Sequence, residues 1–108
     1  NFCGAVRALF DDIDVLVVPA QGTASPTAKK VKDSRRNPRT WSAMEMSRFT
    51  GPFDFTGSPT LTMQSGLTKD GMPIAIQFAA RHFEEDLLVR AGHAYQRETD
   101  WHNEHPAI

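Results

Sequence analysis

The apolar positions of the first twenty residues follow a helical pattern and then a strand pattern. Four of them recur at helical spacing: Phe2, Val6, Leu9 and Phe10. This stripe predicts an amphipathic helix that ends near Phe10. The run from Val15 to Val18 is apolar at every position and closes at Pro19, which is typical of a strand covered on both faces. Only one other convincing helix is predicted in the chain. We therefore expect the second covering layer, and neighbouring strands, to come from residues outside it.

Residues 20–40 show no such periodicity. Gly22, Pro26 and Pro38 lie there among small, polar and basic residues, which predicts a long surface loop. Five basic residues cluster in this stretch: Lys29, Lys30, Lys32, Arg35 and Arg36. No aromatic residues are interleaved with them for base stacking, so a solvated loop is favoured over a nucleic-acid contact. A short helix is then predicted from Ser42 to Phe49. Ser42 is its expected N-cap and Glu45 completes a capping box, and the helix stops at the Gly51–Pro52 break.

The second half of the chain predicts a β-hairpin followed by a helix. Apolar and polar residues alternate from Thr60 to Gln64 and again from Pro73 to Phe78. Asp70 and Gly71 supply the turn, because glycine accepts the positive φ that tight connections require. The helix, from Phe83 to Arg97, has acidic residues in its first turn and Arg97 near its end, as the helix dipole favours. Beyond it, Trp101 is expected to pack back onto the sheet or the helix.

Composition narrows the class of protein. The 108 residues are 40% hydrophobic and 23% charged with a net charge of -1, so one domain at most is expected, with no global attraction to nucleic acid or to an anionic membrane. A single cysteine, Cys3, excludes an internal disulfide framework and is interpreted as a helix residue that is buried. No apolar run approaches the roughly 18 residues of a membrane helix. Cytoplasmic localisation is the resulting expectation.

Several residue groups resemble sites but are interpreted as structural. Ser65 and Lys69 flank the hairpin turn without a motif behind their spacing. Four residues near the C-terminus resemble a metal cluster: Asp100, His102, Glu104 and His105. A fraying tail positions ligands poorly, so no metal is expected there. His82 and His93 are expected to have capping or solvated roles. No catalytic residue and no cofactor site is therefore assigned within the chain.

The order of the segments resembles the C-terminal part of the amidase signature family. The matching pieces are D-x-L-x-x-P at Asp14–Pro19, a loop rich in Thr, Ala and Pro at Thr23–Thr27, F-T-x-P-F-[ND]-x-T-G-x-P at Phe49–Pro59, and D-G-x-P at Asp70–Pro73. The final helix ends near Ala94 and Tyr95, so the resemblance covers nearly the whole chain. The sequence departs from the pattern at Thr60 and at Gln64–Gly66, which affects packing and pocket shape more than chemistry.

The resemblance implies an α/β fold in which these residues form part of a large mixed β-sheet flanked by helices on both sides. It also implies hydrolysis of a carbon–nitrogen (amide) bond by a nucleophilic Ser, a second Ser in a cis peptide and an unprotonated Lys, with a Gly-rich oxyanion hole. None of these groups maps onto this chain, so the catalytic residues are expected upstream and the 108 residues alone are expected to be inactive. Thr50, Phe53 and Asp54 are the residues implied to line the substrate pocket. The alternative is that Phe53 and Phe55 fill the core and that Asp54 caps a turn.

Three functional interpretations remain open. The first is the C-terminal segment, residues 1–108, of a single-domain amidase whose partners are a small amide substrate and the missing N-terminal part of the same protein, as a monomer or a homodimer. The second is a fragment of the amidase-like chain of a tRNA-dependent amidotransferase. Ser47 argues against it, because that chain usually has Asp two residues before the Phe-Thr of the motif. The third is an independent non-catalytic module, which predicts a cooperative, soluble fold in isolation.

Overall fold

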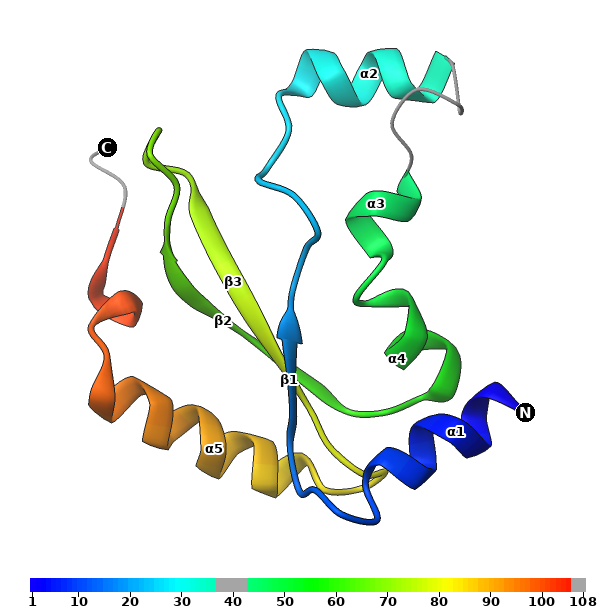
Figure 1. Cartoon of the computed structure of the whole chain (residues 1–108). Helices are drawn as coiled ribbons and strands as arrows, with labels where there is room; N and C mark the ends of the chain where they lie inside the picture. Colours follow the sequence, from blue (N-terminus) through cyan, green and yellow to red (C-terminus); the bar gives the residue numbers. More distant parts are fainter. Residues whose placement is uncertain (37–42, 106–108) are drawn as a thin grey trace.

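The protein is an α/β structure built on one antiparallel sheet (Figure 1). The computed structural model describes residues 1–36 and 43–105. Its elements, in chain order, are α1 (Phe2–Leu9), β1 (Leu16–Pro19), α2 (Ala28–Arg36), α3 (Ala43–Ser47), α4 (Gly51–Thr56), β2 (Thr60–Leu67), β3 (Pro73–Ala79), α5 (Glu85–Glu98) and a 3₁₀ turn, η1 (Trp101–Asn103). The expected helix, strand, hairpin and helix are confirmed. None of the described helices is long and apolar enough to cross a membrane.

The three strands lie in the order β1-β3-β2, so the hairpin partner β3 is central. Both pairings are antiparallel, and Ala79 of β3 lies opposite Leu16 of β1 and Thr60 of β2. A register shift between Gln64 and Gly66 marks a bulge in β2. The hairpin turn is closed by Gly71, whose φ of 75° lies in the left-handed region that favours glycine. The predicted hairpin and its turn are thus confirmed.

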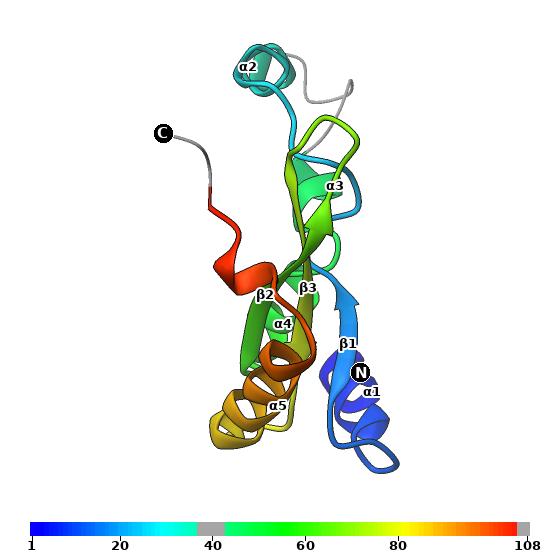
Figure 2. The same ribbon diagram turned by 90° about the vertical axis from the view of Figure 1, so that its left-hand side faces the viewer.

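Helices cover both faces of the sheet. On one face, Val6 and Phe10 from the α1 segment and Phe53 of α4 form a core cluster with Ala79. The neighbouring residue Phe78 points to the other face, where it clusters with Ala80 and with Leu88 of α5. Figure 2 shows α1 and α5 on opposite sides of the strands. Among the described residues, α1 and α4 thus lie over one face of the sheet and α5 lies over β2 and β3 on the other.

Strand β1 is less covered than its sequence predicts. It lies at the edge of the sheet and pairs only with β3 among the described strands. Helix α5 lies over β2 and β3, so it leaves the side chain of Val17 54% exposed. Within these residues, β1 is thus not buried on both faces.

Two helices lie where the sequence predicted none. The first is α2, inside the expected loop over residues 20–40. Thr27 caps its start, since the Lys30 N–H donates to Thr27 Oγ1 at 3.2 Å. Val31 is its only large apolar residue. The sequence therefore lacks the apolar stripe that would predict a helix here.

The second unexpected helix is α4, which begins at Gly51 where only a break was predicted. Proline is tolerated in the first turn of a helix, because its missing N–H needs no intrahelical partner there, and Pro52 occupies that turn. Gly57 ends the helix with φ 70°, and the Ser58 N–H donates to the Phe53 carbonyl at 3.1 Å. The predicted N-cap Ser42 lies outside the described residues, while Glu45 lies in the first turn of α3.

Helix α5 begins two residues later than predicted. Phe83 precedes it with φ 67° and a side chain that is 91% exposed. Inside the helix, Gly92 faces β2 so closely that a Cβ atom there would lie 2.5 Å from Leu61 Cδ2. Trp101 begins η1, which lies against β2, and its side chain is half-buried.

Candidate functional site

The three residues proposed to line a pocket lie together at the start of α4 but point in different directions. Thr50 is the N-cap residue of the helix, and its Oγ1 donates to the Ser47 carbonyl at 3.5 Å. Asp54 lies in the first turn with its side chain exposed. Phe53 is buried in the cluster with Val6 and Phe10. Phe53 therefore fills the core of the described residues, whereas Phe55, which the alternative interpretation also placed in the core, is 72% exposed. Thr50 is half-buried and Asp54 is exposed.

A hollow of about 340 Å³ lies beside this core, between α1, the α4–β2 connection and the β3–α5 connection. Its walls include Cys3 and Arg7 of α1, Thr56 at the end of α4, Ser58 after it, and the pair Arg81 and His82. Cys3, predicted to be buried, is half-buried at the wall of this hollow. A thiol, two hydroxyls and three basic side chains thus line this hollow, and they come from three segments that lie far apart in sequence.

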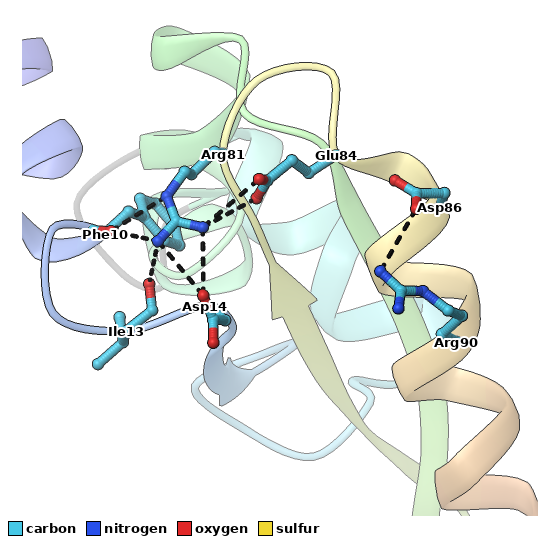
Figure 3. A network of polar contacts seen from close by, with 7 residues as sticks. All are labelled: Phe10, Ile13, Asp14, Arg81, Glu84, Asp86 and Arg90. Carbon is cyan, nitrogen blue, oxygen red and sulfur yellow. Dashed lines mark hydrogen bonds and ion pairs between the residues drawn. The ribbon is translucent and has the colours of Figure 1, made fainter.

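Arg81 makes more polar contacts than the other residues described in this hollow, and the sequence analysis did not identify it. Its guanidinium donates to the Phe10 carbonyl from Nη2 at 2.7 Å and from Nε at 3.1 Å. Nη2 also donates to the Ile13 carbonyl, and Nη1 forms ion pairs with Asp14 at 3.3 Å and Glu84 at 3.2 Å (Figure 3). The hydrogen bond to the Glu84 carboxylate raises the pKa of Arg81, which Asp14 also favours and partial burial opposes. Arg81 remains cationic, and all three of its nitrogens are engaged.

Three more polar residues of the hollow, His82, Thr56 and Ser58, contact one another. His82 Nε2 lies 2.9 Å from the Thr56 carbonyl, and Thr56 Oγ1 lies 2.9 Å from Ser58 Oγ. A hydroxyl becomes a nucleophile when a base is placed beside it, but the imidazole here contacts a carbonyl instead of Ser58. The polar contacts around the hollow therefore join the α1, α4 and β3 segments. None of these contacts places a base beside a nucleophile.

The other candidate groups are not brought together either. Ser65 is half-buried and Lys69 exposed, and no hydrogen bond joins these two described residues. Over residues 1–36 and 43–105, no three His, Cys, Asp or Glu side chains lie close enough to hold a metal ion. His93 is exposed on α5. The basic cluster lies on α2, where the side chains of Lys29, Lys30 and Lys32 are exposed.

A second, wider hollow of about 640 Å³ lies between the segment that follows β1 and the hairpin. Its walls are Pro19 and residues 20–25 on one side and residues 62–65 and 73–76 on the other. The polar side chains among them are Gln21, Thr23, Ser25, Thr62, Gln64 and Ser65. This hollow is formed in part by the Thr- and Ala-rich segment that carries one piece of the family resemblance, but it contains no ionisable side chain.

Comparisons with known proteins identify the family. Residues 2–89 match the model of the Amidase family. The chain is 37% identical over 108 residues to the putative amidase AmiD of Mycobacterium tuberculosis, covering 100% of this chain and 22% of that protein. It is also 37% identical over 102 residues to a glutamyl-tRNA(Gln) amidotransferase chain of Chloroflexus aggregans, covering 93% of this chain and 19% of that protein.

A solved structure shows the same fold. The 6-aminohexanoate cyclic dimer hydrolase superposes with a TM-score of 0.84 at 25% identity, covering 97% of this chain and 23% of that protein. The chain belongs to the amidase family. It spans about a fifth of the length of the relatives that it matches.

Proposed function

We propose that these 108 residues are the C-terminal part of a longer amidase that hydrolyses a carbon–nitrogen bond of a small amide. A nucleophilic Ser, a Ser in a cis peptide and a Lys base are assigned to the part of the protein that precedes Asn1. The 108 residues complete the sheet and one wall of the pocket, and by themselves they are inactive. A cytoplasmic location is part of this proposal, since a single cysteine suits a reducing compartment.

The observation that supports this proposal most directly is the excess of exposed surface. The accessible surface of the chain is 8014 Å², whereas a compact monomer of this mass exposes about 6,000 Å². The radius of gyration is 15.9 Å, compared with about 13 Å for a self-contained domain of this length. Both values indicate a piece whose core is completed by other residues.

The exposed apolar side chains lie where such a completion is needed. Phe2 of α1 and Phe55 of α4 contact each other edge to face at 5.8 Å, yet they are 50% and 72% exposed. On the other face of the sheet, Val17 of the edge strand β1 is 54% exposed. Exposed apolar side chains that lie together mark an interface in a soluble protein. We assign the Phe2–Phe55 surface, and separately the exposed face of β1, to contact with the preceding part of the domain.

The pocket wall of the complete enzyme is assigned to the start of α4. Asp54 is exposed and Thr50 is half-buried there, and Phe53 is buried in the core beneath them. An incoming substrate would meet the first two residues, while Phe53 fixes the position of the helix. Thr50→Val and Asp54→Asn in the longer enzyme should therefore raise KM and leave the free energy of unfolding nearly unchanged.

Amide hydrolysis by the longer protein tests the proposal. The complete reading frame and the 108-residue chain are purified in parallel and assayed with a panel of aryl amides such as p-nitroanilides. Turnover by the longer protein, lost on replacing its catalytic Ser, supports the proposal. Turnover by the 108 residues alone would overturn it. A start codon just upstream of Asn1 would contradict it as well and favour the independent module.

The amidotransferase is the second candidate, and the 37% identity to the Chloroflexus aggregans chain favours it. Ser47, at the C-terminal end of α3 three residues before Thr50, argues against it, since the resemblance implies Asp at that position. Transamidation of glutamyl-tRNA by the longer protein together with a partner protein would establish this candidate. Hydrolysis of small amides without tRNA would favour the stand-alone amidase.

A further inference from the structure

The two halves of the α1–α4 face of the sheet differ in chemistry. Residues directly opposite in an antiparallel pair share a face, so Thr60, Thr62 and Gln64 share this face with Ala79, Gln77 and Ala75. The half beside β1 is apolar and is covered by Val6, Phe10 and Phe53. The half on β2 is polar at all three of these positions, and Thr60 and Thr62 are exposed. We call Thr60, Thr62, Gln64 and Gln77 the polar strip.

Gln77 lies where these two halves meet and is buried without a complete set of partners. Its side chain is on the central strand, between Val18 of β1 and Thr62 of β2, and the residue is only 4% exposed. Among the residues that the structure describes, no group donates a hydrogen bond to its Oε1. A buried carbonyl oxygen without a donor is destabilising, whereas an apolar side chain of the same length would not be.

We propose that the polar strip binds a non-helical segment from the part of the protein that precedes Asn1, and that a backbone N–H of this segment donates a hydrogen bond to Oε1 of Gln77. The proposal rests on the proposed function, which supplies the longer chain. Oε1 is buried within these residues alone, so the proposal requires that Gln77 adopts another rotamer when the segment binds beside the exposed Thr62. Gln77 is thus a positioning residue that fixes the segment against the sheet.

The chemistry of the strip selects the kind of segment. An amphipathic helix presents an apolar stripe to a sheet, and such a stripe would leave the hydroxyls and amides of the strip without partners. A loop has backbone N–H and C=O groups that are not paired within itself and that must find partners when buried. Threonine hydroxyls and glutamine amides both donate and accept hydrogen bonds, so the strip can pair with these groups.

A crystal structure of the longer protein decides the proposal. We expect a backbone N–H from a residue preceding Asn1 within about 3.2 Å of Gln77 Oε1. An ordered water on Oε1, a donor from within the 108 residues, or a helix over the strip would each overturn it. The crystal structure tests the contact without any measurement of turnover. The contact can therefore prove wrong while the amidase assignment holds, and the reverse.

Substitution measures the strength of the contact in the same protein. Gln77→Met keeps the length of the side chain and removes the acceptor, so it should lower the melting temperature by about 2 °C or more. Gln96→Met, at an exposed position of α5, is the matched control and should leave the melting temperature unchanged. An unchanged or raised melting temperature for Gln77→Met would show that the oxygen has no donor and would overturn the proposal.

Discussion

Nη2 of Arg81 donates to the carbonyl oxygen of Phe10 at 2.7 Å, across 71 positions of sequence. This contact joins the end of α1 to the segment that connects β3 with α5. The same guanidinium also reaches Ile13, Asp14 and Glu84 (Figure 3). Arg81 therefore helps to fix the end of α1 against the sheet, together with the apolar cluster that contains Val6 and Phe10.

Replacing Arg81 should destabilise the protein through loss of these backbone contacts. Arg81→Met removes every donor, and Arg81→Lys keeps the charge but not the fork that reaches two carbonyls at once. Both variants should unfold at lower urea concentration than the wild type. Arg81→Lys should be only slightly more stable than Arg81→Met. The matched control is Arg90→Met, whose 3.4 Å pair with Asp86 is exposed. It should change the free energy of unfolding by about 0.5 kcal/mol or less.

The contribution of Arg81 should not depend on pH across the neutral range. Its pKa is raised in the folded state, first by the hydrogen bond to Glu84. A raised folded pKa gives stability that is fully present below the unfolded pKa and is lost only as pH rises through the folded pKa. The difference in stability between wild type and Arg81→Met should accordingly be constant between about pH 6 and about pH 9, within the precision of urea unfolding. A difference that disappears at the upper end of this range would contradict the expectation.

Gly92→Ala should destabilise the packing of α5 on β2. The added Cβ would lie 2.5 Å from Leu61 Cδ2 and 3.1 Å from Met63 Sδ. Overpacking costs about 1–3 kcal/mol, which exceeds the gain in helix propensity of about 1 kcal/mol. In the Leu61→Ala background the same substitution should become neutral or stabilising, because the clashing atom is gone. An equal effect in both backgrounds would show that the helix does not approach the strand this closely.

Gly57→Ala should destabilise through the backbone alone. No atom lies within 4 Å of a Cβ built at this position, but φ is 70°. A left-handed residue with a side chain costs about 1 kcal/mol relative to glycine. Gly51 has the same open surroundings without a positive φ, so Gly51→Ala in the first turn of α4 should be neutral or slightly stabilising. Urea unfolding of both variants separates conformational strain from steric effects.

Tyr95→Phe should remove one hydrogen bond and leave the packing of α5 unchanged. The Tyr95 hydroxyl donates to the Gln64 carbonyl at 3.1 Å, next to the bulge of β2. Its ring contacts Phe78 edge to face at 5.9 Å, a contact that phenylalanine retains. We expect a loss of about 1 kcal/mol in the free energy of unfolding. Tyr95→Leu, which also loses the ring contact, should cost more.

The elements with strong periodicity were predictable from the sequence. Four patterns predicted the bounds of their elements to within a few residues: the stripe ending at Phe10, the apolar run of β1, the alternation around Asp70–Gly71 and the apolar face of α5. Helices α2 and α4 were missed, because one has almost no apolar stripe and the other begins at a Gly-Pro pair that also ends helices. The order of the motifs identified the amidase family, which the comparisons show.

The pairing of the segments was decided only in the tertiary structure. Whether Phe53 faces a pocket or the core depends on α1, and the burial of Gln77 depends on three strands that meet in space. Arg81 offered no signal, because its main partner is a backbone carbonyl far away in the sequence, and carbonyls are the same in every residue. The sequence by itself thus determined the local elements and the family, through periodicity and motif order. The tertiary structure determined which surfaces are completed within these residues and which remain exposed, because burial depends on contacts between distant segments.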